Sequence, residues 1–361
     1  MNALRSALVI GGGPAGATVA TLLARAGTQV TLIESAKFPR IKVCGEFITP
    51  AATDTLHRIL PPAALAALGA ARIDTFTLEC GNRSLSKPLA SPSWSLSRDT
   101  LDTALIAQAT TAGGCIRQPE TVRSATFSDS HAIAHLDTQT LTADIIIHAD
   151  GSGRHDPLGP LPHAKAMVGR KCHANFPAGL VRGVQIRSGS NAYVGSIVVE
   201  SGVGTIALVS RPSLVARFEG NGDAMLRHVW PLWNPAWRTS DWKSSPVPRG
   251  GPITGGHPRS LRIGNAAAAV DPIGGEGIGL ALWSAATLAD MLLSTPGDLE
   301  SLARLHHTFR AAYAVRLRTR HPACRLAAEV LMRPRIIRAL WPLFSLRNGL
   351  LDTWLTLSGK P

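Results

Sequence analysis

Several kinds of residue and segment are scarce in this chain of 361 residues. Five cysteines, Cys44, Cys80, Cys115, Cys172 and Cys324, lie far apart and form no C-x-x-C pair, which argues against a zinc site and a disulfide framework. We therefore expect reduced thiols and no bound metal. No apolar run is long enough for a transmembrane helix, and the first strand follows the N-terminus without a signal-peptide pattern. The sequence thus predicts a cytoplasmic protein.

Acidic residues are also few. Lysine and arginine number 37 against 24 acids, a formal net charge of +13, so the surface should attract anionic partners such as phosphates or acidic lipid. From Ser301 onward eleven cations face only Glu329 and Asp352. The cations alternate with Leu, Ile, Val and Trp, as on amphipathic helices, and no nucleic-acid module is evident. We expect no nucleic-acid partner and a tail that contacts anionic membrane peripherally.

A short unit near the N-terminus carries the strongest motif. Residues 7–34 read ALVIGGGPAGATVATLLARAGTQVTLIE, an apolar strand, a glycine turn, a helix and a second strand. Gly11, Gly13 and Gly16 have the G-x-G-x-x-G spacing, in which the first permits a tight turn, the second lets a pyrophosphate approach the backbone and the third allows close helix–strand contact. The helix N-terminus, with its free N–H groups and positive dipole end, favours a diphosphate there.

The acid that ends the second strand completes this dinucleotide cradle. Glu34 lies 18 residues after Gly16, close to the spacing at which an acid accepts hydrogen bonds from the adenosine ribose hydroxyls. An unphosphorylated ribose is implied, and the bound dinucleotide would be FAD or NAD. Further cofactor-binding candidates in this unit are Pro14, Ala15 and Ser35.

Four separated motifs carry a resemblance to a known family: the GGGPAG turn with Glu34, KVCGE at 42–46, SRDTLD at 97–102, and the pair ADGSGR at 149–154 and IGNAAAAVDPIGGEGIG at 263–279. On these motifs the chain resembles FAD-dependent oxidoreductases of the group that includes p-hydroxybenzoate hydroxylase, flavin halogenases and geranylgeranyl reductases. A plain NAD-binding domain has no reason for a second glycine-rich turn and helix so late in the chain. FAD is therefore favoured over NAD.

The resemblance implies an α/β fold. A Rossmann-like FAD-binding domain of the glutathione reductase-like (GR2) type would carry an inserted antiparallel β-sheet substrate domain and a C-terminal helical segment, since a chain of this length exceeds what one core usually supports. The expected division is 1–75 with 96–160 and 250–295 as a discontinuous FAD-binding domain, 76–95 with 161–249 as the substrate domain, and 296–361 as the basic helical segment.

The resemblance also implies individual cofactor contacts. Arg98 would reach the FAD diphosphate or ribityl chain, Asp150 would hold the nucleotide loops together, and Val122 would offer backbone contacts to adenine. Asn265 stands where the family usually has Asp; its amide oxygen can still accept a bond from a ribityl hydroxyl, but one negative charge beside the cofactor is lost. Further cofactor-binding candidates are Arg40, Lys42, Gly151, Asp271, Gly275, Gly277 and Ile278.

Two loops would lie along the flavin. Cys44, Gly45 and Glu46 correspond to a C-G-G-type run of geranylgeranyl reductases, with Glu46 in place of a glycine and Cys44 as a packed thiol rather than a nucleophile. From Pro272 the second loop would pass along the isoalloxazine and enter a helix at Gly277 or Ile278, whose positive terminus stabilises reduced flavin. Glu276 in that loop is expected to be solvated. The catalytic residues stay unassigned, and the flavin-face candidates are Cys44, Gly45, Glu46, Pro272 and Gly277.

The middle of the chain is expected to form the substrate domain. Residues 192–209 look like its central strands, with Tyr193, Ile197 and Val199 on one face, although ordinary sheet packing would give the same pattern. The four tryptophans nearby could form a substrate wall or a packing cluster, and their spacing is not the W-x-W-x-I of flavin halogenases. These tryptophans are Trp230, Trp233, Trp237 and Trp242.

Two functions remain open on the motifs. The first is an NADH- or NADPH-dependent monooxygenase that hydroxylates or epoxidises a hydrophobic small molecule through a flavin C4a-hydroperoxide. The alternative is a reductase that delivers hydride to a C=C bond, for which the KVCGE loop and the basic tail suit a lipid-like substrate. A halogenase and a non-catalytic flavoprotein are lesser alternatives. The cofactor motifs do not separate them.

The tail, residues 301–361, is predicted to be helical and interrupted at Pro322, Pro334 and Pro342. One hypothesis places its apolar side chains in lipid or at the substrate entrance, and its arginines on phosphates. The alternative is a helix packed on the FAD domain with a solvated basic face. The side chains concerned are Trp341, Phe344, Leu350 and Trp354, with Arg333, Arg335, Arg338 and Arg347.

Overall fold

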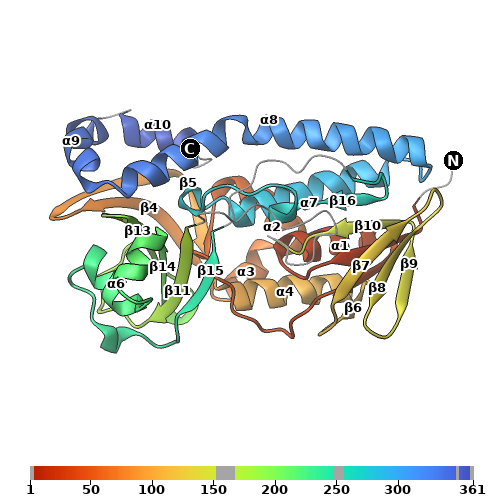
Figure 1. Cartoon of the computed structure of the whole chain (residues 1–361), viewed down its shortest axis with the longest axis horizontal. Coiled ribbons are helices and arrows are strands. Elements are labelled where there is room, and N and C mark those ends of the chain that lie inside the picture. Colours follow the sequence, from red (N-terminus) through yellow and green to blue (C-terminus); the bar gives the residue numbers. More distant parts are fainter. Residues whose placement is uncertain (1–3, 152–166, 248–255, 347–348, 358–361) are drawn as a thin grey trace.

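The computed structural model describes residues 4–151, 167–247, 256–346 and 349–357 of the chain (Figure 1). Several sequence predictions fall outside these described residues. They are the domain boundaries at 160 and 250, the last three residues of ADGSGR and Arg347.

A parallel sheet of five strands, in the order β16-β10-β1-β2-β6, forms the half of the molecule that carries the N-terminal glycine turn. Its strands are nearly continuous apolar runs because both of their faces are covered. Helices cover one face, and a small sheet of three strands, β7-β8-β9, packs against the other. The strands are β1 (Ser6–Ile10), β2 (Gln29–Ile33), β6 (Cys115–Arg117), β7 (Val122–Phe127), β8 (Ala132–Leu136), β9 (Thr140–Ala143), β10 (Ile145–His148) and β16 (Ser260–Arg262).

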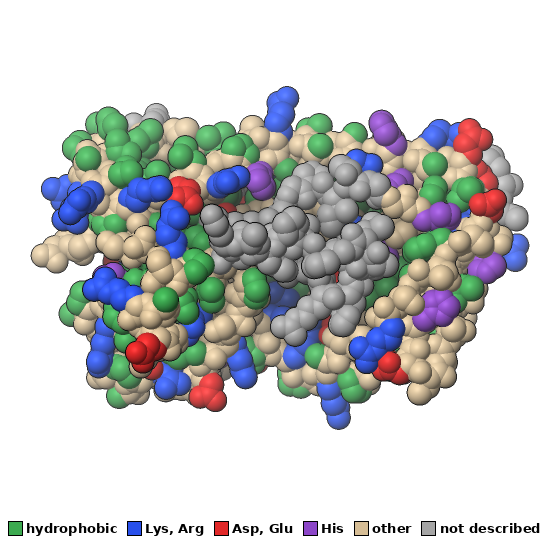
Figure 2. Space-filling view, viewed as in Figure 1, with side chains coloured by type: hydrophobic (Ala, Val, Ile, Leu, Met, Phe, Trp, Pro, Cys, Tyr) green, Lys and Arg blue, Asp and Glu red, His purple; other side chains and the backbone are tan. Residues whose placement is uncertain are grey.

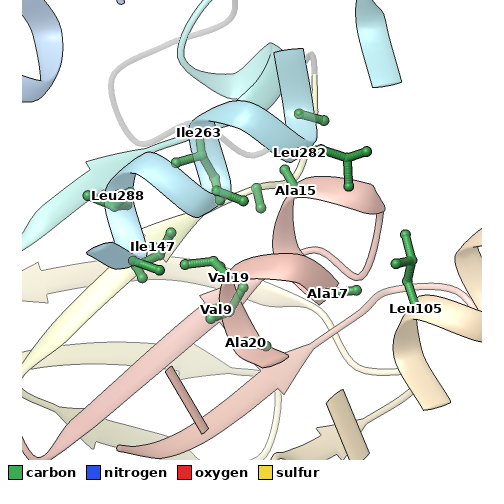
Figure 3. Close-up of a cluster of buried hydrophobic side chains, with 14 of the residues drawn as sticks. Val9, Ala15, Ala17, Val19, Ala20, Leu105, Ile147, Ile263, Leu282 and Leu288 are labelled. Carbon is green, nitrogen blue, oxygen red and sulfur yellow. The ribbon is translucent and has the colours of Figure 1, made fainter. Parts of the chain in front are cut away.

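Small side chains on α1 (Pro14–Arg25) let three helices share one face of this sheet. Ala17 and Ala20 are fully buried, and α1 packs between α4 (Arg98–Thr111) and α7 (Gly277–Leu293). Figure 3 shows the resulting core, in which apolar side chains of all three helices and of the strands meet. The predicted helix start at Gly277 is confirmed. The SRDTLD motif starts α4, which is capped by the Ser97 side chain. Two short helices, α2 (Pro50–Ile59) and α3 (Pro62–Ala67), complete this half.

An eight-stranded, largely antiparallel sheet forms the other half, in the order β15-β11-β14-β13-β12-β4-β5-β3. The predicted boundary at 75/76 falls inside β4, and β3 also comes from the N-terminal segment, so the two halves exchange strands. Its strands are β3 (Phe47–Ile48), β4 (Ala71–Cys80), β5 (Arg83–Ser95), β11 (Val168–Ala174), β12 (Val184–Gly189), β13 (Ala192–Val198), β14 (Gly204–Ser210) and β15 (Lys243–Pro246), with helices α5 (Pro212–Arg217) and α6 (Gly222–Val229) on one side.

The two faces of this sheet bury different clusters. Tyr193, Ile197 and Val199 are buried together on one face, which confirms the predicted alternation. Trp230 and Trp233 belong to the opposite face, with α6 and Val194. Since alternate residues of β13 point to opposite sides, the tryptophans pack beneath the sheet, as in the packing interpretation.

Three C-terminal helices, α8 (Leu299–Leu331), α9 (Pro334–Ser345) and α10 (Leu350–Leu357), lie over both sheets, and α8 runs along the length of the molecule (Figure 1). The predicted break at Pro334 is confirmed, because α9 begins there. The predicted breaks at Pro322 and Pro342 are wrong, because both prolines lie inside helices. An internal proline costs about 3 kcal/mol, and burial of α8 on both sides of Pro322 offsets this cost.

The tail aromatics lie on the inner side of the tail. Trp341, Phe344 and Trp354 pack inward against the cluster that contains Tyr193, and the rings of Trp354 and Phe76 have centroids 5.6 Å apart. They are not lipid-facing, because the apolar sheet face beneath them offers a drier surface than solvent. Among the described helices, none has the length and apolar character needed to span a bilayer.

The α/β architecture with an inserted antiparallel sheet and a helical C-terminal segment agrees with the predicted fold class.

Candidate functional site

The glycine turn after β1 leaves no room for side chains at two of its positions. A Cβ at Gly11, whose φ is +100°, would lie 2.6 Å from the Ala149 carbonyl oxygen, and a Cβ at Gly16 would lie 1.8 Å from the Gly11 carbonyl oxygen. Gly13 differs, because the nearest atoms to its Cβ position are one guanidinium nitrogen each of Arg40 and Arg98, at 3.8 Å. Backbone packing thus explains the first and third glycines, while the second borders space lined by two cations.

Those two guanidinium groups are held by a buried acid. Arg98 Nε and Nη2 each donate to Asp102 at 2.8 Å, and Arg40 Nη1 lies 3.6 Å from the same carboxylate, which has no exposed surface. Arg40 Nη2 also donates to Glu34 Oε2 at 3.2 Å. Sequence reasoning missed Asp102, although its spacing of four residues from Arg98 on a helix was a usable signal.

Glu34 ties the cradle together at the end of β2. Its carboxylate accepts from Gly12 N at 2.8 Å and Ala36 N at 2.9 Å, and Ser35 Oγ donates to it at 3.2 Å. Burial acts to raise the pKa of Glu34, but the charge of Arg40 and the two backbone N–H groups lower it overall. The carboxylate is therefore ionised and can accept hydrogen bonds from a ribose.

Lys42 belongs to the same charged group. Burial and the neighbouring charge of Arg40 lower the pKa of the Lys42 ammonium, while Glu34 opposes that change. The structure thus gathers the predicted diphosphate contacts Arg40, Lys42 and Arg98 around the N-terminus of α1.

This arrangement fits the diphosphate of a dinucleotide. Arg40 Nε and Nη1 are buried without a hydrogen-bond partner among the described residues, and unpaired guanidinium donors inside a protein are costly. A phosphate beside Gly13 would lie next to Arg40 Nη2 and Arg98 Nη2 and would also meet the positive end of α1.

Two further predicted loops converge on the same turn. The Asp150 Cα lies 2.8 Å from the Cβ position of Gly11, so the backbone after β10 packs directly on the glycine turn. Gly264, at the start of the turn that carries Asn265, lies against Ala15, with 3.1 Å from its Cβ position to the alanine methyl. Gly151 follows Asp150 with a φ of +80°. The segment leading to Val122 passes beside Glu34, because Glu120 N donates to the Glu34 carbonyl oxygen at 2.8 Å.

The loop before α7 is anchored to the large sheet. The side chain of Asp271 accepts from Ile273 N at 3.2 Å and from the Tyr193 hydroxyl at 2.8 Å. Pro272 begins a short 3-10 turn, and Gly275 follows it with a φ of +63°. At Gly277 a Cβ would meet no atom within 4 Å, whereas Ile278 is buried in the core. The backbone at the start of α7 is therefore accessible to a ligand.

Glu276 is not the solvated acid predicted from the sequence. Its side chain is only 1% exposed, and Arg320 Nη1 of α8 lies 3.6 Å from its carboxylate. The prediction failed because the loop pattern gave no sign that α8 would cover this turn.

The KVCGE loop brings Glu46 into contact with three separate segments. Its carboxylate accepts from Arg98 N at 2.7 Å, lies 3.3 Å from His173 Nε2, and is bonded by the Lys171 ammonium and the Thr205 hydroxyl. Glu46 has a φ of +57° and no exposed surface. Its side chain therefore joins this loop to α4 and to strands β11 and β14.

Electrostatics keep Glu46 ionised despite its burial. Burial acts to raise its pKa, but hydrogen bonding from His173 and the charge of Lys171 lower the pKa to about 2. Lys171 and His173 were not found by sequence reasoning, because they lie more than a hundred residues away in a strand without a motif.

The neighbours of Glu46 in the loop are more open. Cys44 is half-buried; its sulfur accepts from Glu46 N at 3.3 Å and interacts with the Arg98 guanidinium. A Cβ at Gly45 would meet no atom within 4 Å. Of the flavin-face candidates, Gly45 and Gly277 thus present open backbone, while Glu46 is fully engaged by protein groups.

Comparison with known proteins agrees with this geometry. Residues 5–154 match the family model described as the FAD binding domain. The N-terminal part of the chain is therefore similar to the FAD-binding domain of FAD-dependent oxidoreductases. FAD is thus the cofactor that this domain accommodates.

One relative aligns with most of this flavoprotein. A menaquinone reductase of Mycolicibacterium smegmatis is 28% identical over 344 residues, covering 81% of this chain and 78% of the relative.

Two solved structures that share the fold are described as a halogenase and a brominase. The flavin-dependent halogenase CmlS aligns with a TM-score of 0.74 at 19% identity, covering 88% of this chain and 63% of CmlS, so the flavoprotein spans less than two thirds of that chain. The flavin-dependent brominase Bmp2 aligns with a TM-score of 0.75 at 17% identity, covering 99% of this chain and 94% of Bmp2. Similarity at these identities establishes the fold, and the predicted GR2-like fold is confirmed.

Proposed function

We propose that this flavoprotein is an NADH- or NADPH-dependent reductase that saturates a C=C bond of an apolar, lipid-like substrate. The observation that carries the proposal is the buried group of Glu46, Lys171 and His173, because C=C reduction needs a proton donor besides the source of hydride. The menaquinone reductase that aligns with most of the chain supports the same choice.

The chain's cofactor contacts follow from the geometry above. Arg40 and Arg98 would bind the FAD diphosphate at the N-terminus of α1, and Glu34 would bind the ribose. When bound, FAD supplies two-electron hydride chemistry.

By strand register, His173 of this group lies on the apolar face of the sheet. His173 pairs with Thr205, and Thr205 pairs with Ile197, so all three share the face that carries Tyr193. Tyr193 in turn contacts Asp271 of the loop before α7. The group therefore lies on the face joined to both predicted flavin loops.

His173 is the member that can exchange a proton. Its side chain is 15% exposed, against 1% for Lys171 and 0% for Glu46. Because Glu46 is ionised, His173 Nε2 donates to it, which leaves Nδ1 as the ring atom that takes up and releases the proton. Glu46 would orient the imidazole, with Lys171 balancing the buried carboxylate.

The apolar face itself would exclude water from the reaction. Tyr193, Ile197, Val199 and Val209 are each at most 4% exposed, and the helices α8 to α10 cover the same cluster. Dry surroundings of this kind also suit oxygen transfer, so the monooxygenase predicted from the sequence is the second candidate.

Product analysis separates the two candidates. Turnover of a menaquinone with NADH or NADPH under strict anaerobic conditions should give a product that stays two hydrogens heavier after reoxidation in air, because a quinol formed at the ring would lose its two added hydrogens. A product that gains an oxygen atom and forms only in the presence of O2 would contradict the reductase and support the monooxygenase.

A variant tests the proton donor. His173→Gln should lower kcat about a hundredfold while leaving flavin reduction by NADH or NADPH unchanged in stopped-flow absorbance. Unchanged turnover in His173→Gln would remove His173 from the mechanism.

A further inference from the structure

Exposed apolar side chains gather on the outer surface of α9 and α10. Half of the ten large apolar residues exposed in the described ranges lie between 336 and 357, with exposures from 38% to 56%. We call this set the α9–α10 surface. It consists of Ile336, Leu343, Leu346, Leu350 and Leu357.

Packing inside the molecule does not account for this surface. The inner side of α9 is already occupied, because Ile337, Trp341 and Phe344 pack against the large sheet. Ile336 and Leu343 are seven residues apart and so lie on one side of the helix. A surface helix normally exposes polar residues opposite its buried side, so α9 is apolar on two sides.

Positive charge borders the same surface. Arg333, Arg335 and Arg338 are exposed at the start of α9. The nearby acids are neutralised, since Asp352 Oδ2 accepts from Lys87 Nζ at 2.9 Å and Glu329 pairs with Arg333 at 3.1 Å. Figure 2 shows apolar side chains gathered at the end of the molecule where Figure 1 places α9 and α10, with lysine and arginine side chains around them.

We propose that the α9–α10 surface docks on a bilayer that contains anionic lipid. Leucine and isoleucine side chains would enter the boundary between headgroups and acyl chains, and the arginines would contact lipid phosphates. The combination of exposed arginines and exposed apolar side chains on one helix favours lipid over a second copy of the chain, since like charges would face each other across a symmetric dimer.

The position of this surface deepens the proposed function, and in this respect it rests on that proposal. The inner side chains of α9 and α10 join the cluster that contains Tyr193 and Ile197. A single layer of helices therefore separates the docking surface from the candidate substrate face, which suits a substrate drawn from the bilayer.

Vesicle sedimentation of the FAD-loaded protein tests docking without any turnover, so its outcome is independent of whether the enzyme is a reductase. Binding to vesicles of phosphatidylcholine with phosphatidylglycerol should exceed binding to pure phosphatidylcholine at least tenfold at low salt, and it should fall as salt rises. Equal sedimentation with both vesicle types would overturn the proposal.

Variants separate the two parts of the surface. The double variant Leu343→Glu with Leu346→Glu should abolish binding to both vesicle types. Arg335→Gln with Arg338→Gln should reduce binding to the anionic vesicles about tenfold and leave the neutral baseline unchanged.

A matched control and a folding check complete the test. The double variant Val315→Glu with Leu326→Glu places the same two charges on α8 at residues that are 72% and 67% exposed, and its vesicle binding should equal that of the parent protein. Each variant should retain the flavin absorbance band. A dimer in light scattering that Leu343→Glu with Leu346→Glu converts to a monomer would show a protein interface and overturn the proposal.

Discussion

The glycine cradle and the Glu46 junction both hold buried charge, but they are assembled in different ways. In the cradle, the turn at Gly11–Gly16 and the acid Glu34 come from one continuous segment, so their geometry follows from local spacing. At the junction, Glu46 meets Lys171, His173 and Thr205 from distant strands. The first site is therefore formed by neighbouring residues of one segment, whereas the second forms only when the two halves of the molecule pack together.

The cradle should show the largest response to substitution. Gly16→Val puts a side chain where a Cβ alone would lie 1.8 Å from a carbonyl oxygen, so α1 cannot pack and we expect loss of both bound flavin and the folded state. Flavin absorbance and thermal unfolding measure these outcomes.

Gly13→Ala and Gly169→Ala serve as controls for that result. Gly13→Ala should fold but lose FAD affinity at least tenfold, because its Cβ occupies only the space beside the guanidinium groups. Gly169→Ala, whose Cβ would make ordinary contacts at 3.5 Å, should retain both. A stable Gly16→Val protein with normal FAD content would disprove the packing account.

Substitution of Glu46 at the junction should lower the stability of the folded protein. Glu46→Gln leaves the Lys171 ammonium buried without a counter-charge, which we expect to cost about 3–5 kcal/mol in the free energy of unfolding. Denaturant unfolding measures this loss. Glu300→Gln removes an acid from the exposed pair with Arg304 and should change stability by less than about 1 kcal/mol. Equal effects of the two variants would mean that the buried charge is compensated elsewhere.

Acid should remove part of the same stabilisation. The folded-state pKa of Glu46 is lowered from 4.5 to about 2, so its contribution is fully present above pH 4.5 and is lost as the pH falls toward 2. The stability difference between parent and Glu46→Gln should therefore shrink between pH 5 and pH 3, about the range that this shift covers. Thermal unfolding at both pH values checks it, and a constant difference would contradict the lowered pKa.

The smallest expected effect is that of substituting Asp102, the acid that binds Arg40 and Arg98. Asp102→Asn weakens the hold on Arg98 and Arg40, so FAD affinity should fall about tenfold, or about 1.4 kcal/mol, while the fold persists. Reconstitution of the apoprotein with FAD measures the change. Asp99→Asn, on the same helix without these contacts, should bind FAD normally; a matching loss there would point to a general effect on α4.

Other features of the molecule could be predicted from the sequence only in part. The pairing of Arg98 with Asp102 could have been predicted from their spacing in SRDTLD, and the helix start at Gly277 was predicted correctly. The side that the tail aromatics face stayed open between lipid, the substrate entrance and the protein itself, because periodicity defines the sides of a helix but does not say which one meets the core. The exposed apolar side of α9 is defined only by the tertiary structure, in which Trp341 and Phe344 pack against the large sheet.

Sequence by itself determined the dinucleotide cradle, because the steric demands at Gly11 and Gly16 and the placement of Glu34 act within one strand–turn–helix–strand unit. Tertiary structure alone decided the partners of Glu46 and the burial of Glu276, since charges far apart in the chain meet only after the sheets and α8 have packed. It also decided that α8 continues through Pro322, because side chains buried on both sides of that residue outweigh the backbone cost.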